Sequence, residues 1–348
     1  MAYTTINKST DYFNTKLYTG NGGTQSITGV GHQPDWVWIK RRDSSGSHII
    51  TDAVRGTGKI ISSNSNGAEF DEGSNGVSAF GTDGFSIGNL SSINTNSGTF
   101  ASWNWKAGGG QGSSNTDGSI NTTYTSVNTT AGFSICKWTG TGANGTIGHG
   151  LGAVPTVIFV KNLGTTENWV TYHKPLGATK YLKLNDNSAQ GTSSDVWNNT
   201  APTSSVFYVG SNTATNQSGN QMIAYCFAEK TGYSKFGSYT GNGNSDGTFI
   251  YTGFRPSWMM IKESSNAGNE WYISDGTRSP TNAGTGSAKV IAASGSGAEE
   301  SGQSYNQFDI VSNGYKVRGD DTRSNGSGRT YIYMAFGQSL VGSNNVPC

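Results

Sequence analysis

A five-residue motif occurs three times along the chain and fixes how the chain divides. An aromatic residue is followed each time by Thr-Gly-x-Gly, a proline follows the first glycine by 14 or 15 residues, and a lysine follows the proline by six. Similarity at a fixed period predicts repeated structural units rather than one irregular domain. The positions that define the repeat are Tyr18, Gly20, Pro34 and Lys40, then Trp138, Gly140, Pro155 and Lys161, then Tyr239, Gly241, Pro256 and Lys262.

Each copy closes on an aromatic segment, so the copies have similar lengths of about 100 residues, enough to bury a core of their own. The short junction between the second and third copies allows little independent motion, so these two are expected to sit against each other. Residues 1–11 are predicted to be a polar arm that docks onto a neighbouring protein. The end of the linker between units one and two is compatible with an additional strand that leads into unit two. The predicted divisions are 1–11 (arm), 12–106 (unit one), 107–130 (flexible Gly/Ser/Thr-rich linker), 131–229 (unit two), 230–233 (junction), 234–337 (unit three) and 338–348 (tail).

Strand patterns dominate within the units. Short runs rich in Val, Ile, Trp, Tyr and Phe are bounded by Gly, Asn and Ser, and no segment has a capped 3.6-residue period. The 51 glycines supply turns, and only 13% of residues are charged. We therefore predict an all-β protein of three tandem antiparallel β-sandwich domains, jelly-roll-like in architecture. A β-propeller is the rival, but the repeat is twice as long as a blade.

Several classes of protein are disfavoured by composition and motif. A net charge of +1 disfavours nucleic-acid binding, and no apolar run reaches the length for membrane insertion. Residues 140–145 match the GxGxxG fingerprint of dinucleotide-binding proteins, but they do not lie between a predicted strand and a predicted helix. Residues 55–60 resemble a phosphate-binding loop but lack its first glycine and its final Ser or Thr. No cofactor is therefore predicted. Cys136, Cys226 and Cys348 have no disulfide or zinc spacing and are expected to be free thiols, made in a reducing cytoplasm.

The histidines and acidic loops do not predict a metal site. His32 and His149 lie shortly before a repeat proline, where a turn histidine that bonds a backbone carbonyl is the favoured interpretation. No HxH or HExxH spacing occurs. The acidic loops at 185–187, 299–300 and 320–321 offer oxygen ligands for Ca²⁺ but match no calcium motif, so solvated loops are favoured.

Recurring carboxylates raise the question of catalysis. Asp52 with Arg55, and Asp275 with Arg278, are compatible with a catalytic acid beside a cation or with an ion pair and Asx turn; the structural interpretation is favoured. Glu69 and Glu299 resemble a glycosidase acid pair, but unit two has a glutamine at this position. We predict that the protein is not an enzyme.

Four aromatic residues are candidates for stacking on a sugar ring at a host surface. Sugar recognition commonly stacks a ring on an aromatic face beside Asn or Asp hydrogen bonds, which the segment 195–199 around Trp197 offers. Core packing is the default interpretation for any single tryptophan. The candidates are Trp197, Tyr208, Trp271 and Tyr305.

With the repeats laid out, the chain resembles virion structural proteins of marine tailed bacteriophages, of the cyanophage and pelagiphage type. The resemblance covers nearly the whole chain and keeps the order and spacing of the motifs. It transfers no catalytic residue. The matching stretches are 11–20, 33–40, 232–243, 251–256 and 331–336.

The resemblance implies a place on a phage particle. The expected function is a non-enzymatic virion protein exposed on the surface as a tail or head fibre or appendage. It is expected to be made in the host cytoplasm and to touch host polysaccharide. Its expected partners are other capsid or tail proteins and further copies of itself, with a trimer as the expected oligomer. The alternatives are a capsid decoration or cement protein and, from another class, a polysaccharide-degrading tail appendage.

Overall fold

The computed structural model describes residues 3–280, 282, 288–301 and 308–342. Strands make up nearly all of its regular structure, which confirms the all-β, sandwich-type prediction. In the ranges described, no helix is long and apolar enough to span a membrane. The helical segments are η1 (Ser9–Asp11), η2 (Gly73–Asn75), η3 (Lys174–Leu176), α1 (Ser91–Asn94), α2 (Ser194–Trp197) and α3 (Thr213–Asn216).

Each unit contains one larger, inner sheet with the same antiparallel order: first strand, closing strand, post-proline strand, following strand. Extra strands extend the sheets of units two and three at their edges. In order across the sheet, unit one has β1 (Phe13–Thr19), β9 (Thr99–Trp105), β3 (Trp36–Arg41) and β4 (Ile49–Asp52). The sheet of unit two has β10 (Thr122–Asn128), β11 (Phe133–Thr139), β18 (Gln221–Phe227), β13 (Val157–Asn162), β14 (Val170–His173), β15 (Lys180–Lys183) and β16 (Gly191–Thr192). That of unit three has β19 (Ser234–Thr240), β26 (Thr330–Gln338), β21 (Arg255–Glu263), β22 (Tyr272–Asp275) and β23 (Val290–Ala292).

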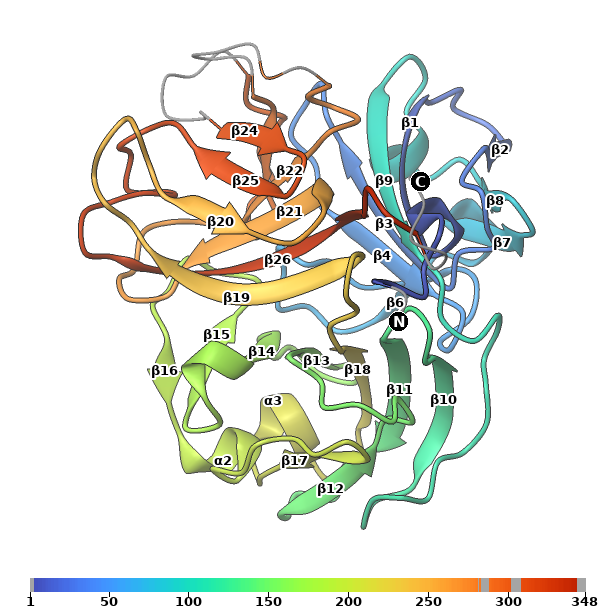
Figure 1. Ribbon diagram of the computed structural model, residues 1–348. Coiled ribbons are helices and arrows are strands. Elements are labelled where there is room, and N and C mark those ends of the chain that lie inside the picture. The colour runs from blue at the N-terminus through green and yellow to red at the C-terminus, as the bar shows by residue number, and fades with distance from the viewer. Residues whose placement is uncertain (1–2, 281, 283–287, 302–307, 343–348) are drawn as a thin grey trace.

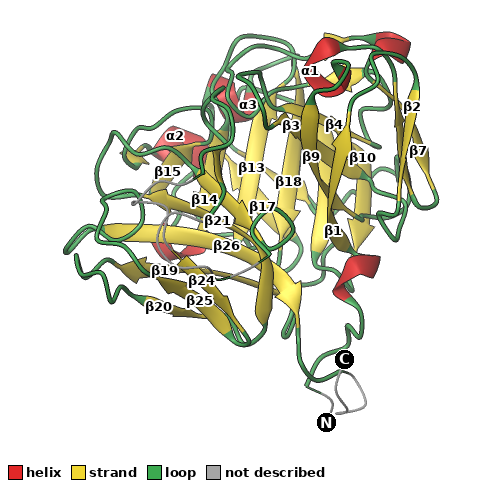
Figure 2. Ribbon diagram, turned by 90° about the horizontal axis from the view of Figure 1, so that it is seen from above, coloured by secondary structure: helices red, strands yellow, loops and turns green. Residues whose placement is uncertain are grey.

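A small outer sheet covers one face of each inner sheet. Figure 2 shows the outer sheets of units one and three at different edges of the molecule. A separate apolar cluster lies between the two layers of each unit, as a sandwich requires. The outer strands are β2 (Gln25–Thr28), β8 (Gly84–Ile87) and β7 (Val77–Gly81) in unit one, β12 (Gly145–Gly148) and β17 (Val206–Val209) in unit two, and β20 (Phe249–Tyr251), β25 (Gly314–Val317) and β24 (Phe308–Val311) in unit three; β5 (Lys59–Ile60) and β6 (Phe70–Asp71) pair separately.

The other face of each inner sheet turns toward the centre of the molecule. In β3, Val37 and Ile39 belong to the outer cluster of unit one, whereas Trp36 and Trp38 belong to a central cluster. This explains why the post-proline segments are apolar on both alternating faces. The central cluster takes residues from all three units, among them Trp105, Phe227 and Phe336, and the units surround it as three lobes (Figure 1).

The segment 107–130, expected to be a flexible linker, is held along its length. The Asp35 carboxylate accepts hydrogen bonds from the backbone N–H of Ala107 at 2.7 Å and of Gly109 at 2.9 Å. The lead-in strand forms as β10, which pairs with β11. Composition alone misleads here because these anchors satisfy the backbone of a glycine-rich segment.

Residues 3–11 of the arm pack on their own chain. Ile6 is 1% exposed and belongs to the central cluster. The Ser9 N–H donates to the Gln338 side chain at 2.6 Å, and the Gln338 side-chain amide donates to the Asn7 carbonyl at 3.1 Å. An apolar residue within a polar stretch therefore ties residues 3–11 to the end of unit three.

Candidate functional site

The Thr-Gly-x-Gly turns are each closed by one buried asparagine. In unit two, the Asn216 side chain accepts from the Thr141 N–H at 3.1 Å and donates to the carbonyls of Ala143 at 2.6 Å and Gly210 at 3.2 Å. A Cβ at Gly140 would collide with the Gln217 carbonyl, which explains the first glycine. Asn94 and Asn325 make the equivalent bonds in units one and three, and all three asparagines are 0% exposed.

The sequence interpretation missed these asparagines, although a signal was present. Each stands five residues before the first residue of a closing strand, at Thr99, Gln221 and Thr330. The other repeat positions are also structural. Tyr18 and Tyr239 stack on Phe100 and Tyr331 at 5.1 and 5.0 Å, Trp138 packs on Phe207 edge to face, and Pro34, Pro155 and Pro256 are buried.

Three seams join the units in a closed cycle, and we name them by the units they join. At seam 1–2, the Trp169 indole N–H donates to the Ser62 carbonyl at 2.8 Å. At seam 2–3, the Trp271 indole N–H donates to the Lys183 carbonyl, also at 2.8 Å. At seam 1–3, His48 Nε2 lies 2.9 Å from the Ala292 carbonyl oxygen and donates to it. The residue at the same position of the repeat therefore forms a hydrogen bond from each unit to another unit.

Buried ion pairs occupy seams 1–2 and 1–3. Arg55 Nε donates to Asp52 at 2.5 Å, and Arg278 Nε donates to Asp275 at 2.5 Å; all four side chains are 0% exposed. Asp52 Oδ1 also accepts from the Val54 and Arg55 N–H groups at 3.0 and 2.9 Å, which forms the expected Asx turn. The ion-pair interpretation is confirmed.

Each of these aspartates also receives a donor from a neighbouring unit. The Tyr225 hydroxyl of unit two donates to Asp52 at 2.7 Å, and the Trp103 indole of unit one donates to Asp275 at 3.0 Å. Burial raises the pKa of Tyr225 well above its usual value, so this hydroxyl keeps its proton. Each carboxylate thus accepts hydrogen bonds from two units.

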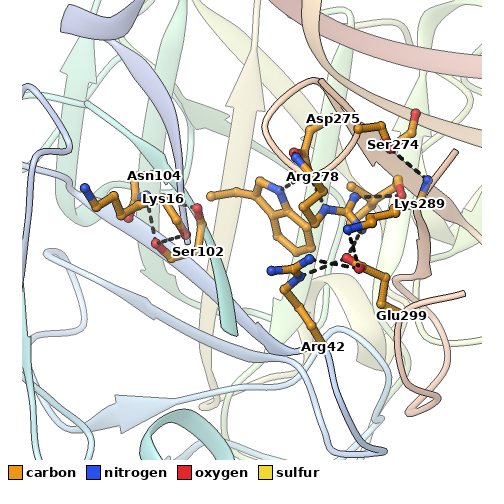
Figure 3. Close-up of polar contacts among 12 residues, drawn as sticks. Lys16, Arg42, Ser102, Asn104, Ser274, Asp275, Arg278, Lys289 and Glu299 are labelled. Carbon is orange, nitrogen blue, oxygen red and sulfur yellow. Dashed lines mark hydrogen bonds and ion pairs between the residues drawn. The ribbon is translucent and has the colours of Figure 1, made fainter. Parts of the chain in front are cut away.

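The glutamates at the end of the repeat extend the same networks. Glu299 accepts from Arg42 of unit one at 2.9 Å through both oxygens and from Arg278 at 3.2 Å, and Figure 3 shows both guanidinium groups converging on it. Burial raises the pKa of Glu299, but the hydrogen bonds from Arg42 and the charge of Arg278 outweigh it and leave the pKa below its ordinary value. Glu69 contacts Arg55 at 3.2 Å.

Seam 2–3 lacks this ion pair. His173 replaces the aspartate and Leu176 replaces the arginine, and His173 Nε2 lies 3.2 Å from the Tyr333 carbonyl oxygen. Burial lowers the pKa of His173 to about 4, so the imidazole is neutral at pH 7 and donates from Nε2. The backbone link persists, because the Gln190 N–H donates to the Ser264 carbonyl at 2.9 Å, as Glu69 and Glu299 do at their own seams.

The three repeat lysines are buried beside the seams. Lys161 Nζ donates to the carbonyls of Asn162 at 2.8 Å, Glu167 at 2.9 Å and, across seam 1–2, Asn66 at 3.2 Å. Lys40 and Lys262 also donate to the carbonyl of the residue that follows them, at 2.8 Å. All three are 0% exposed, and burial lowers the pKa of each to about 8.

The histidines before the repeat prolines bond to backbone carbonyls, as predicted. His32 Nδ1 lies 2.8 Å from the Thr10 carbonyl oxygen. His149 Nδ1 accepts from the Leu151 N–H at 3.2 Å, so Nε2 carries the proton and donates to the Thr203 carbonyl at 3.2 Å. Within the described part of the chain, no three His, Cys, Asp or Glu side chains gather closely enough to hold a metal ion. Cys136 and Cys226 are free and buried, as expected, and Cys348 lies outside the described residues.

The prediction of exposed aromatic residues is wrong for both tryptophans. Trp197 and Trp271 are each 2% exposed: Trp197 packs edge to face on Tyr172 inside unit two, and Trp271 belongs to the central cluster. Neither ring can stack on a sugar, because apolar side chains cover it. Tyr208 is half-buried on β17, and Tyr305 lies outside the described residues.

Other aromatic side chains are exposed instead. Tyr251 is 62% exposed, Phe70 60%, Phe249 43% and Tyr3 42%. Phe249 and Tyr251 point outward from β20 while Ile250 between them points inward. Strand geometry places alternate residues on opposite faces, but all three residues of β20 are apolar, so the sequence does not show which face is exposed.

Comparison with known proteins identifies the family of the chain but assigns it no function. A family model described as a domain of unknown function (DUF7483) matches residues 8–339. The chain belongs to this family. The match runs through all three units, so the family domain corresponds to the whole three-lobed body. No curated protein and no solved structure matches the chain.

Proposed function

We propose that this member of the DUF7483 family is a non-enzymatic structural protein of a bacteriophage virion. It is displayed on the particle surface as a tail or head fibre or appendage, is made in the host cytoplasm, and contacts host glycans. The bacteriophage assignment rests on the resemblance of its repeats to virion proteins of marine phages. The structural role rests on the seams.

The observation that carries the structural role is how the recurring polar side chains are used. Asp52, Asp275 and Glu299, which would be the acids of a hydrolase, are bound by arginine and by donors from a second unit. A buried carboxylate held in this way is part of the fold, because removing its partner would leave an uncompensated buried charge, and it is not available to a substrate. Three lobes locked around one core form a rigid body that presents loops from every unit, as an attachment protein needs.

Particle composition tests the proposal. Mass spectrometry of purified virions of the phage that encodes the chain is expected to find it in stoichiometric amounts, and antibody labelling in electron microscopy is expected to mark the tail or a head appendage. Finding the protein in infected cells but not in purified particles would overturn the proposal. The expected oligomer is checked separately by light scattering, where a trimer has three times the chain mass of 36.6 kDa.

The lobed architecture also favours a second candidate, a capsid decoration or cement protein. Three similar units around one centre match the local symmetry of threefold positions on an icosahedral shell. A particle reconstruction distinguishes the two candidates: density repeated over the shell supports decoration, and density confined to the tail or to one vertex supports an appendage. New reducing ends after incubation with host polysaccharide would instead favour the polysaccharide-degrading appendage.

A further inference from the structure

Two exposed tyrosines from distant parts of the chain meet beside the junction of units two and three. Tyr3 belongs to the arm, and Tyr251 is the last residue of β20. The Tyr3 hydroxyl donates to the Gly253 carbonyl at 2.8 Å. Gly253 has φ +81°, and a Cβ there would lie 2.8 Å from the Tyr3 hydroxyl oxygen and 3.6 Å from that of Tyr251. The glycine therefore lets the two hydroxyl groups converge above the backbone.

A groove runs from these tyrosines along the junction. It contains a cavity of about 300 Å³ lined by Tyr3, Tyr251, Thr231, Glu229 and Lys235. A second cavity of about 410 Å³ is also lined by Glu229 and Lys235 and continues past Lys174 and Pro175. The shared residues make the two cavities neighbours, and each is large enough for a small-ligand site.

Polar groups stand between the two cavities. Lys235 Nζ donates to Glu229 at 2.9 Å, and the other oxygen of Glu229 accepts from the Phe236 N–H at 2.9 Å. The side chains remain 43% and 30% exposed. An ammonium group has three protons and a carboxylate about four acceptor positions, so both groups retain capacity for hydroxyl groups of a ligand.

We propose that this groove binds hexopyranose units of a polysaccharide. A pyranose ring has an apolar C–H face, which stacks on an aromatic ring, and a rim of hydroxyl groups, which exchange hydrogen bonds with charged side chains. The Tyr3–Tyr251 end offers the rings, and Glu229 and Lys235 offer the hydrogen bonds one step along the groove. The proposal deepens the proposed function and rests on it for the source of the polysaccharide, the host surface.

The groove is built by the fold of the whole chain. The arm is fixed by Ile6 in the central cluster and by the bonds between Ser9 and Gln338, so Tyr3 is placed without a ligand. Burial, and to a lesser degree the nearby Tyr251, raises the pKa of Tyr3, so its hydroxyl stays protonated at neutral pH. A site placed in advance loses less conformational entropy when it binds.

Saturation-transfer NMR and calorimetry on the full chain test the groove. The probes are hexasaccharides of glucose, mannose and galactose and a uronate hexasaccharide, each at millimolar concentration. At least one is expected to bind, and Tyr251→Ala is expected to weaken that binding about tenfold or more. Tyr251→Phe, which keeps the ring, is expected to retain most of it.

Phe70→Ala is the matched control, because Phe70 is an aromatic residue of similar exposure on β6 of unit one. It is expected to leave the affinity within about twofold. The assignment of the groove would be overturned if none of the hexasaccharides bound, or if Tyr251→Ala and Phe70→Ala lowered the binding affinity equally. Neither result bears on particle composition, whereas absence of the protein from virions would overturn the proposed function and leave the groove intact.

Discussion

Seam 1–3 and seam 2–3 occupy equivalent places in the fold but are held by different chemistry. Seam 1–3 buries the Asp275–Arg278 pair and adds Glu299 and Arg42, whereas seam 2–3 has His173 bonded to a backbone carbonyl and Leu176 in the place of the arginine. The tryptophan or histidine bond to the next unit persists at both. The position that holds Asp275 in one seam and His173 in the other therefore makes a hydrogen bond to another unit in both seams and does not require a charge.

Removing the arginine from seam 1–3 is expected to have the largest effect. Arg278→Leu introduces the residue type of seam 2–3 but leaves Asp275 buried without its cation, which costs about 3–5 kcal/mol of unfolding free energy. Denaturant titration measures the loss. The double exchange Asp275→His/Arg278→Leu, which introduces the histidine and the leucine of seam 2–3, is expected to recover at least half of it. A loss below about 1 kcal/mol in the single variant would show that the carboxylate does not depend on the pair.

The asparagine turns are expected to be equally sensitive in every unit. Asn94→Ala, Asn216→Ala and Asn325→Ala each remove a side chain that satisfies several backbone groups, and each is expected to cost about 2–3 kcal/mol. Similar losses of unfolding free energy, measured by thermal or chemical unfolding, would show that the turns are equivalent in all three copies, whereas the seams are not. A loss in one unit that is much smaller than in the others would contradict this equivalence.

Stability is expected to rise with pH from about 8 to 9.5. The pKa of Lys40, Lys161 and Lys262 is about 8 in the folded chain and about 10.4 when unfolded. In this window the unfolded chain binds more protons, so deprotonation favours the folded state by about 1.5 kcal/mol per lysine, on the order of 5 kcal/mol in total. Unfolding titrations at several pH values measure the slope. Lys161→Met should reduce it by about one third, and an unchanged slope would assign it to other groups.

Leu176 is expected to give the smallest effect. It is partly buried and packs at the edge of the central cluster, and Leu176→Ala is expected to cost about 1 kcal/mol. The contrast with Arg278→Leu at the equivalent position sharpens the comparison of the two seams. Equal losses at both positions would mean that packing, and not charge pairing, dominates there.

The all-β, sandwich-type fold could be predicted from the sequence because turn residues and apolar runs are local signals. The sequence did not predict that Trp36 and Trp38 meet the cores of other units, because a strand that is apolar on both faces does not identify its second neighbour. The exposure predicted for Trp197 is wrong because its neighbours in the sequence do not indicate where its ring lies. Trp197 ends α2, and Asn198 and Asn199 follow with φ of +49°, so the chain turns and leaves polar neighbours above a buried ring. The Tyr3–Tyr251 groove depends on the contact of Tyr3 with Gly253, 250 residues away in the sequence, a separation that local patterns do not bridge.

The covalent connection of the three units has an evolutionary consequence. A homotrimer assembled from one such unit would carry every substitution three times, once at each interface. In the single chain a substitution enters one seam at a time, as the histidine and leucine of unit two illustrate. A single chain therefore allows each copy to differ from the others, so a loop or groove can change in one lobe while the other two continue to hold the body together.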